Sequence, residues 1–206
     1  MPLKVNSLKD AFSESKISKV ENLDLWDTKN MSSVFENASN FNQDLSKWNT
    51  ENVTDMSAMF KDAIKFNQPL NKWKVNNVKD MDDMFAGAKE FNQDLDKWET
   101  SSLANINQMF WDATSFNGNI TTWDISKVKS LYNTFAGASS FNQNISNWDT
   151  SNVITMKIAF SRAKAFFQNL SNWNVKKVTA TKNFNKEIQN TFGEGKIPKF
   201  TIAITY

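Results

Sequence analysis

The sequence repeats itself every 25 residues over most of its length. The unit from Phe41 to Lys65, FNQDLSKWNTENVTDMSAMFKDAIK, shows this most clearly. Two phenylalanine columns, which begin at Phe41 and Phe60, keep the same period. The tryptophan Trp48 recurs in each later unit, as Trp73, Trp98, Trp123, Trp148 and Trp173. A fixed period of this length is typical of a solenoid, in which each unit buries its apolar face by stacking on its neighbours.

The composition argues against several kinds of site. The chain has no cysteine and no histidine, which excludes disulfides, Cys/His metal sites and histidine acid–base catalysis. The net charge of +2 is too small to favour nucleic acid. No apolar run approaches the roughly 20 residues of a membrane span, and residues 1–4 do not begin a signal peptide. We therefore expect no cofactor, no metal, no nucleic-acid partner and no direct membrane insertion. Export would need a signal or lipid anchor outside this sequence.

Within each unit the apolar residues follow two patterns. The alternation from Trp48 to Thr50 is typical of a short strand. From Val53 to Phe66 apolar residues recur at spacings of three and four, which predicts a short helix. Gly87 and Gly137 stand where two of these helices would end. A residue that commonly caps a helix N-terminus precedes the stripe in successive units: Asp55, Asp80, Asn105, Ser130 and Thr155.

The tryptophan column and a column of asparagines both have structural explanations. We expect the tryptophans to be buried, because each takes a core-leucine position of the repeat, although a carbohydrate-stacking role is the alternative. The asparagine column that begins at Asn42 predicts a ladder, in which each side-chain amide bonds backbone groups freed at a turn. This column continues through Asn67, Asn92, Asn117 and Asn142 and breaks at Phe167.

The repeat is irregular at both ends of the chain. Phe12 precedes Phe35 by 23 residues, so the first unit is shortened or shifted. We divide the chain into an N-terminal cap and irregular first coil (1–30), a repeat solenoid (31–184) and a C-terminal cap (185–206). Residues 199–206 alternate in polarity, which predicts a terminal strand. That strand either pairs with the last open edge or contacts another chain, which would make the protein a homo-oligomer.

The order Leu-x-x-Trp-x-Thr-x-x-Val, followed by a short helix, is a leucine-rich-repeat layout. The fuller pattern, FNQ-x-L-S-x-W-x-T-S-x-V-x-x-M-x-x-M-F-x-x-A, resembles the BspA-like leucine-rich-repeat surface proteins of mycoplasmas and other host-associated bacteria. It covers about residues 10–185, with departures at Gly118, Phe167 and the tail. The resemblance implies a surface-exposed, non-enzymatic binding or adhesion protein, often lipid-anchored. The expected fold is an α/β, leucine-rich-repeat-type right-handed solenoid, with one short parallel strand and one short helix per 25-residue coil.

The outward positions of the predicted strands form the candidate binding face. In a solenoid such positions line one continuous surface. The face changes from lysine-rich to acidic along the chain, which suits a protein partner or a charged glycan. An ordinary solvated face is the alternative. The candidate binding residues are Lys47, Asn49, Lys72, Lys74, Lys97, Glu99, Asp124 and Asp149.

Two sets of three carboxylates are candidates for metal binding or catalysis. Asp80, Asp82 and Asp83 form the densest acidic cluster, but they lack the spacing of a calcium-binding loop. Glu99, Asp124 and Asp149 could stack on neighbouring coils for acid–base work, but a shallow face rarely perturbs a pKa as catalysis requires. We do not expect an enzyme.

These observations predict a binding or adhesion module at the cell surface or in the extracellular space. Its partner would be a host or bacterial protein or a glycan. The alternative is a structural spacer or an antigenically variable coat module without a defined ligand.

Overall fold

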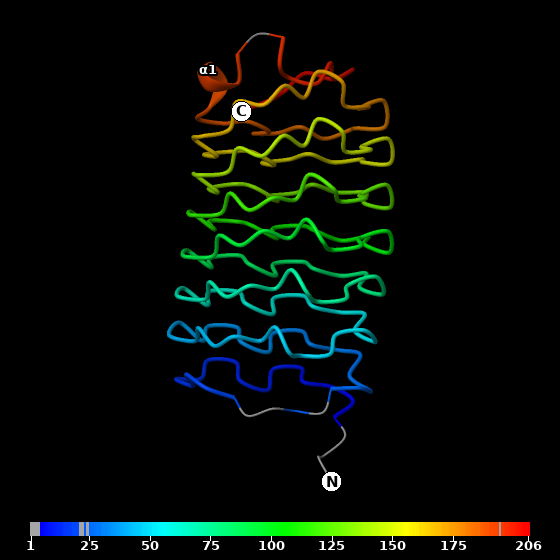
Figure 1. Ribbon diagram of the computed structural model, residues 1–206. Helices are drawn as coiled ribbons and strands as arrows, with labels where there is room; N and C mark the ends of the chain where they lie inside the picture. Colours follow the sequence, from blue (N-terminus) through cyan, green and yellow to red (C-terminus); the bar gives the residue numbers. More distant parts are fainter. Residues whose placement is uncertain (1–4, 21–22, 24, 194) are drawn as a thin grey trace.

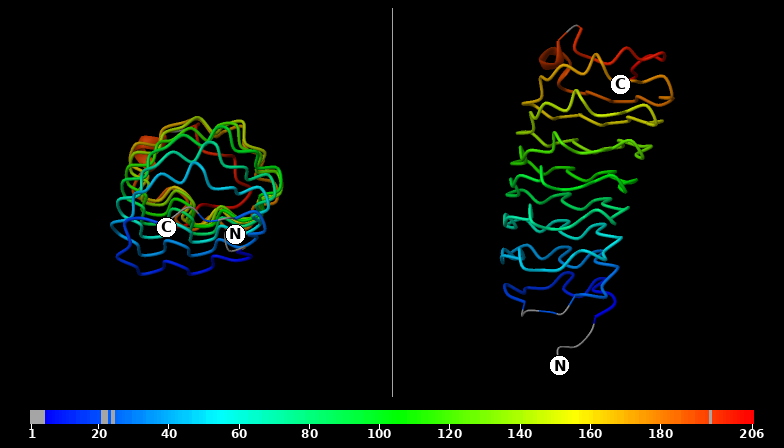
Figure 2. Two further views of the ribbon diagram at one scale, coloured as in Figure 1. Left: turned by 60° about the horizontal axis from the view of Figure 1, so that its bottom comes forward. Right: turned by 45° about the vertical axis from the view of Figure 1, so that its right-hand side comes forward.

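The computed structural model describes residues 5–20, 23, 25–193 and 195–206. Residues 1–4, 21, 22 and 24 of the predicted N-terminal cap lie outside this set. The chain winds into coils that stack in an almost straight column, with the N-terminus at one end and the C-terminus at the other (Figures 1 and 2). The solenoid predicted from the 25-residue period is confirmed.

Successive coils are in parallel register, but the bridges are single-residue contacts. They join Asn30 to Asp55, Asp55 to Asp80, and Asp80 to Asn105. The prediction of a strand at Trp48–Thr50 was wrong. Residues 46–47 and 51–52 on either side of it form turns, and no strand is assigned anywhere in the described chain. The parallel bridges instead lie at the positions that were expected to cap helices.

The prediction of one helix per coil was also wrong. In the described residues the only α-helix is α1, Gln189–Phe192, near the C-terminal end (Figure 1). Residues 57–62 form turns, and both Ala58 and Asp62 adopt a positive φ, of 52° and 54°. The N–H of Phe60 donates to the carbonyl of Met84 in the next coil at 2.9 Å, whereas the N–H of Lys61 donates back to the carbonyl of Ala58 at 3.1 Å.

The apolar spacing that predicted a helix is therefore found on a backbone of successive turns. The chain turns at two left-handed residues that are four positions apart, and this spacing is close to the 3.6 residues per turn of an α-helix. The side chains of Met56, Met59, Phe60 and Ala63 consequently all face the core and are fully buried. Every second N–H of this segment is left to bond the next coil, which an α-helix would not allow.

The expected cap residues do accept backbone hydrogen bonds. The Asp55 carboxylate accepts from the N–H of Ser57 at 2.9 Å, and the Asn105 side chain accepts from the N–H of Asn107 at 3.1 Å. Such bonds to the residue two positions later close local turns as readily as they begin helices. The capping chemistry was correctly anticipated, although no helix follows it.

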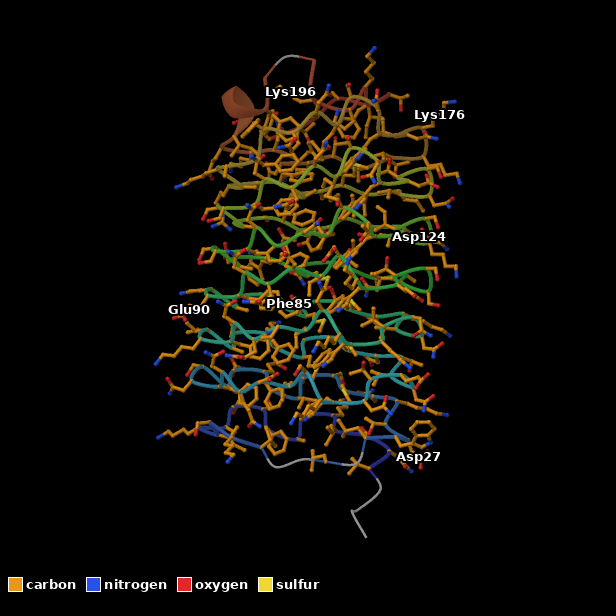
Figure 3. The ribbon with its side chains drawn as sticks, in the orientation of Figure 1. Asp27, Phe85, Glu90, Asp124, Lys176 and Lys196 are labelled. Atoms are coloured by element: carbon orange, nitrogen blue, oxygen red, sulfur yellow. The ribbon has the colours of Figure 1, made fainter. Side chains whose placement is uncertain are left out.

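Aromatic stacks form the core of the column. Phe60 stacks on Phe66 of its own coil at 3.9 Å between ring centroids, and on Phe85 of the next coil at 5.7 Å. Figure 3 shows Phe85 among these stacked rings inside the column. Trp98 stacks on Trp123 at 5.9 Å, and each tryptophan of the column is at most 8% exposed. Burial of the tryptophans is confirmed, and their stacked faces are closed to a sugar ring.

The asparagine ladder is confirmed as well. The Asn42 side-chain oxygen accepts from the N–H of Asn67 at 2.9 Å, and the Asn67 oxygen accepts from the N–H of Asn92 at 2.9 Å. The last rung runs from the N–H of Phe167 to Asn142 at 3.2 Å. The N–H of Phe167 still donates to the rung before it, but the phenylalanine side chain cannot accept from the next coil. The ladder therefore ends at Phe167.

Neighbouring coils alternate between two forms, which doubles the period to 50 residues. Thr50, Thr100 and Thr150 donate their hydroxyls to a carbonyl of the following coil at 2.9–3.1 Å. The coils between them carry apolar residues at this position: Val75, Ile125 and Val175.

Both ends are closed by atypical coils. Leu8 donates to the carbonyl of Asn30, an offset of 22 residues, whereas Met31 donates to that of Asp55, an offset of 24. The first coil is therefore two residues shorter, as the spacing of Phe12 and Phe35 predicted; their rings stack at 5.6 Å.

The C-terminal tail lies against the last coil. The N–H of Asn183 donates to the carbonyl of Thr205 at 2.6 Å, and the Thr181 hydroxyl donates to that of Ala203 at 2.9 Å. The Tyr206 hydroxyl adds a 2.8 Å bond to Asn185. The tail thus covers the open edge, as one of the two predictions for residues 199–206 required, although it forms no assigned strand.

Candidate functional site

The face predicted to bind is hollowed between two rows of turns. Each coil has two turns on this face, residues 46–47 and 51–52 in the first regular unit, with residues 48–50 between them. Two adjoining hollows of about 350 and 490 Å³ lie here and share Lys97 and Glu99. We call them the polar groove, which is lined by Glu51, residues 71–76, residues 96–101, Thr122 and Asp124.

The groove brings together five of the eight predicted residues: Lys72, Lys74, Lys97, Glu99 and Asp124. Lys74 pairs with Glu51 at 3.1 Å, and Lys97 pairs with Asp96 at 3.3 Å. Both lysine side chains are more than 60% exposed, and ion pairs this exposed contribute about 1 kcal/mol or less. A charged ligand can therefore displace them at little cost.

Three predicted residues, Lys47, Asn49 and Asp149, do not line the groove. Two of them, Asn49 and Asp149, close turns of their own coil. Asn49 accepts from the N–H of Glu51 at 3.1 Å, and Asp149 accepts from the N–H of Ser151 at 2.9 Å. Bonding to the side chain and backbone N–H of Ser151 lowers the pKa of Asp149.

Asp124 closes the same kind of turn. It accepts from the N–H of Ser126 at 2.9 Å, and bonding to the Ser126 side chain and N–H lowers its pKa. Lys74 and Glu99 occupy this column too, but neither is seen to close such a turn in the described residues. At Lys74 and Glu99, two of its three positions in the groove, the column carries a long charged side chain in place of the short turn-forming one.

In the acidic cluster of Asp80, Asp82 and Asp83, two of the three carboxylates have local partners. The Asp80 carboxylate accepts from the N–H of Asp82 at 2.9 Å, and Asp83 pairs with Lys61 at 3.0 Å. Burial, together with the charges of Asp83 and Asp80, raises the pKa of Asp82 to about 6. Across the described positions, no three His, Cys, Asp or Glu side chains are arranged to hold a metal ion. No helix there is long and apolar enough to cross a membrane.

With this geometry established, comparison with known proteins places the chain. The family described as "Mycoplasma protein of unknown function, DUF285" matches residues 6–120 and 93–195. The chain belongs to the DUF285 family. The two matches overlap and extend over nearly the whole column, so each spans several coils of the DUF285 fold. No curated protein and no solved structure matches the chain.

Sequence reasoning missed two groove residues of this DUF285 chain. The Asn71 amide donates to Asp96 at 2.8 Å, and its side-chain oxygen accepts from the N–H of Lys97 at 2.9 Å. The bond from Asn71 leads the causes that lower the pKa of Asp96. A signal was present: Ser or Thr fills this column in the other regular units, as in Ser46 and Thr121. Only the units of Asn71 and Asp96 depart from it.

Proposed function

We propose that this DUF285 chain is a non-catalytic binding module that recognises a protein or glycan partner through the polar groove. One observation carries the proposal. Positions that elsewhere hold small turn-forming residues carry Lys74, Glu99, Asn71 and Asp96 in two adjacent coils, and those coils line a hollow of binding-site size. Turn stability alone does not call for the long charged side chains of Lys74 and Glu99.

The charge pattern of the groove favours a partner that itself carries charge. Lys72, Lys74 and Lys97 lie beside Glu51 and Glu99. Alternating charges of this kind select orientation and partner more than they raise affinity. The continuous face of a solenoid is also well suited to an extended ligand.

We place this module at the bacterial cell surface or in the extracellular space, as a binding or adhesion protein of the BspA-like leucine-rich-repeat type. The support is the shared aromatic repeat pattern. The alternative is a spacer or variable coat module, in which the column only sets a distance.

Binding of the purified protein to an array of host matrix proteins and glycans, at low and physiological salt, tests the proposal. The Lys72→Glu/Lys74→Glu variant should lose a specific signal and keep its circular dichroism spectrum. Lys129→Glu/Lys164→Glu, which makes the same charge change outside the groove, should keep the signal. An equal loss in both variants would mean non-specific charge attraction. Absence of any signal would favour the spacer.

A further inference from the structure

The second of the two left-handed positions in each turn segment recurs every 25 residues. It is occupied by Asp62, Gly87, Asp112, Gly137 and Arg162, with φ between 51° and 72°. Since aspartate and arginine adopt this conformation here, the backbone alone does not require glycine. Space does: a Cβ on Gly87 would lie 2.0 Å from the Asp62 carboxylate, and one on Gly137 would lie 1.8 Å from that of Asp112. Each aspartate therefore fills the room that the next glycine leaves.

In the C-terminal half of the column a guanidinium completes this arrangement. Arg162 reaches across the coil of Gly137 and pairs with Asp112 at 3.1 Å. The two residues are 50 positions apart, and glycine between them lets their side chains meet. Ala136 and Ser161, which are small and buried, directly precede Gly137 and Arg162 in the sequence.

The equivalent place 50 residues earlier is a hollow of about 110 Å³. It is lined by Asp62, Ala86, Gly87, Trp111 and Asp112, and we call it the Gly87 niche. Asp62 corresponds here to Asp112, and Asp112 stands where Arg162 would stand. The niche thus contains the carboxylate but lacks the guanidinium, and Trp111 replaces Ser161 on its wall.

Among the residues whose positions are described, no cation forms an ion pair with Asp62 as Arg162 does with Asp112. Burial leads the causes that raise the pKa of Asp62, and the charges of Glu36 and Asp83 add to it. Lys61 and Lys89 act in the opposite direction, but Lys61 is paired with Asp83 and neither lysine forms an ion pair with Asp62. Within the described part of the chain, the Asp62 carboxylate therefore has no ion-pair partner.

We propose that the Gly87 niche binds the guanidinium of an arginine side chain from a protein partner. The Asp62 carboxylate takes the role that Asp112 has toward Arg162, and the indole of Trp111 lies beside the cation. Carboxylates bind guanidinium through charge-assisted hydrogen bonds, and tryptophan is the preferred aromatic neighbour of a cation. Lysine lacks the planar fork that the chain itself uses at the equivalent place.

The niche is separate from the polar groove. Glu90, three residues after Gly87, lies on the opposite side of the column from Asp124 in Figure 3. The two surfaces share no lining residue. The proposal therefore stands or falls independently of the function assigned to the groove.

Titration of the ¹⁵N-labelled protein with N-acetylarginine methylamide tests the proposal, with the Trp111 indole N–H resonance as the reporter. Trp111→Phe identifies that resonance. We expect a saturable shift with the arginine compound and a much smaller one with the neutral citrulline analogue. Asp62→Asn, which is isosteric and suits a left-handed backbone, should weaken binding by about tenfold or more, which corresponds to a loss of about 1.4 kcal/mol or more.

Two variants control the measurement. Asp149→Asn removes the same charge elsewhere and should bind as the wild type does, and Lys72→Glu/Lys74→Glu should do the same. Asp112→Arg would supply the missing guanidinium within the chain and should abolish the shift. Equal responses to arginine and citrulline, or unchanged affinity in a folded Asp62→Asn variant, would overturn the proposal.

Discussion

The indole N–H of Trp98 donates a 3.0 Å hydrogen bond to the carbonyl oxygen of Leu70 in the preceding coil. The same bond is made by Trp73, Trp123, Trp148 and Trp173, at 2.9–3.3 Å. Each tryptophan therefore joins two coils in two ways, by stacking its ring and by satisfying a carbonyl that has little access to water. A core leucine at this position would provide only the apolar contact.

Trp98→Ala should lower the free energy of unfolding by about 3–5 kcal/mol, because it removes a buried ring from the centre of the stack. Trp98→Phe keeps an aromatic ring and leaves the Leu70 carbonyl unpaired, with an expected loss of about 1–3 kcal/mol. Urea unfolding measures both. If the alanine variant lost less than the phenylalanine variant, the ring would not be stabilising the stack.

Asn92→Ala should cost about 0.5–1.5 kcal/mol, because it removes the acceptor for the N–H of Asn117, which donates to it at 2.8 Å. Asn92→Asp retains an acceptor oxygen and is the matched control. Hydrogen exchange of the Asn117 amide provides a local readout: it should accelerate in the alanine variant and stay protected in the aspartate variant. Equal protection in both would contradict the ladder.

Gly137→Ala should destabilise the protein by about 1–3 kcal/mol, because the added methyl group displaces the Asp112 carboxylate and breaks its pair with Arg162. Asp112→Ala removes the obstructing carboxylate. The double variant should therefore be more stable than the two single losses, added together, would allow. Strict additivity in urea unfolding would show that the carboxylate does not occupy the space above the glycine.

The charge on Asp82 should destabilise the folded protein near neutral pH. Its folded pKa of about 6 lies above the ordinary value of 3.8, owing to burial and then to Asp83 and Asp80. The protonated Asp82 carboxyl therefore stabilises the fold relative to the charged form. This contribution is complete below pH 3.8 and is lost as the pH rises through about 6. The stability of Asp82→Asn relative to wild type should increase between pH 4 and pH 7.

Thermal unfolding at several pH values measures this difference. Asp149→Asn is the control of opposite sign. Its pKa is lowered by bonding to Ser151, so the charged form stabilises the fold and that contribution is lost as the pH falls through its folded pKa. Parallel pH profiles for the two variants would contradict the assignment.

The groove shows how far sequence reasoning extends to the site. Alternation along the chain correctly placed Lys72, Lys74 and Lys97 on one surface, although the underlying element is a pair of turns and not a strand. The same reasoning gave Asp149 a binding role, because the pattern shows where a side chain lies and not which backbone N–H it accepts from. Asn71 was missed because its partners, Asp96 and Lys97, lie in the next coil, 25 and 26 residues later in the sequence.

The 25-residue period by itself determined the register of the column, the identity of the core and the asparagine ladder. Burial and column position follow directly from which residue types recur. Only the tertiary structure decided the conformation of each coil. Apolar spacings of three and four suit a helix and a pair of left-handed turns equally, and every residue carries the same N–H. The choice depends on whether a neighbouring coil presents a carbonyl within reach, and stacking supplies one to every second N–H. The same stacking brings Arg162 to Asp112 across a glycine, a contact between coils that no spacing within a single unit encodes.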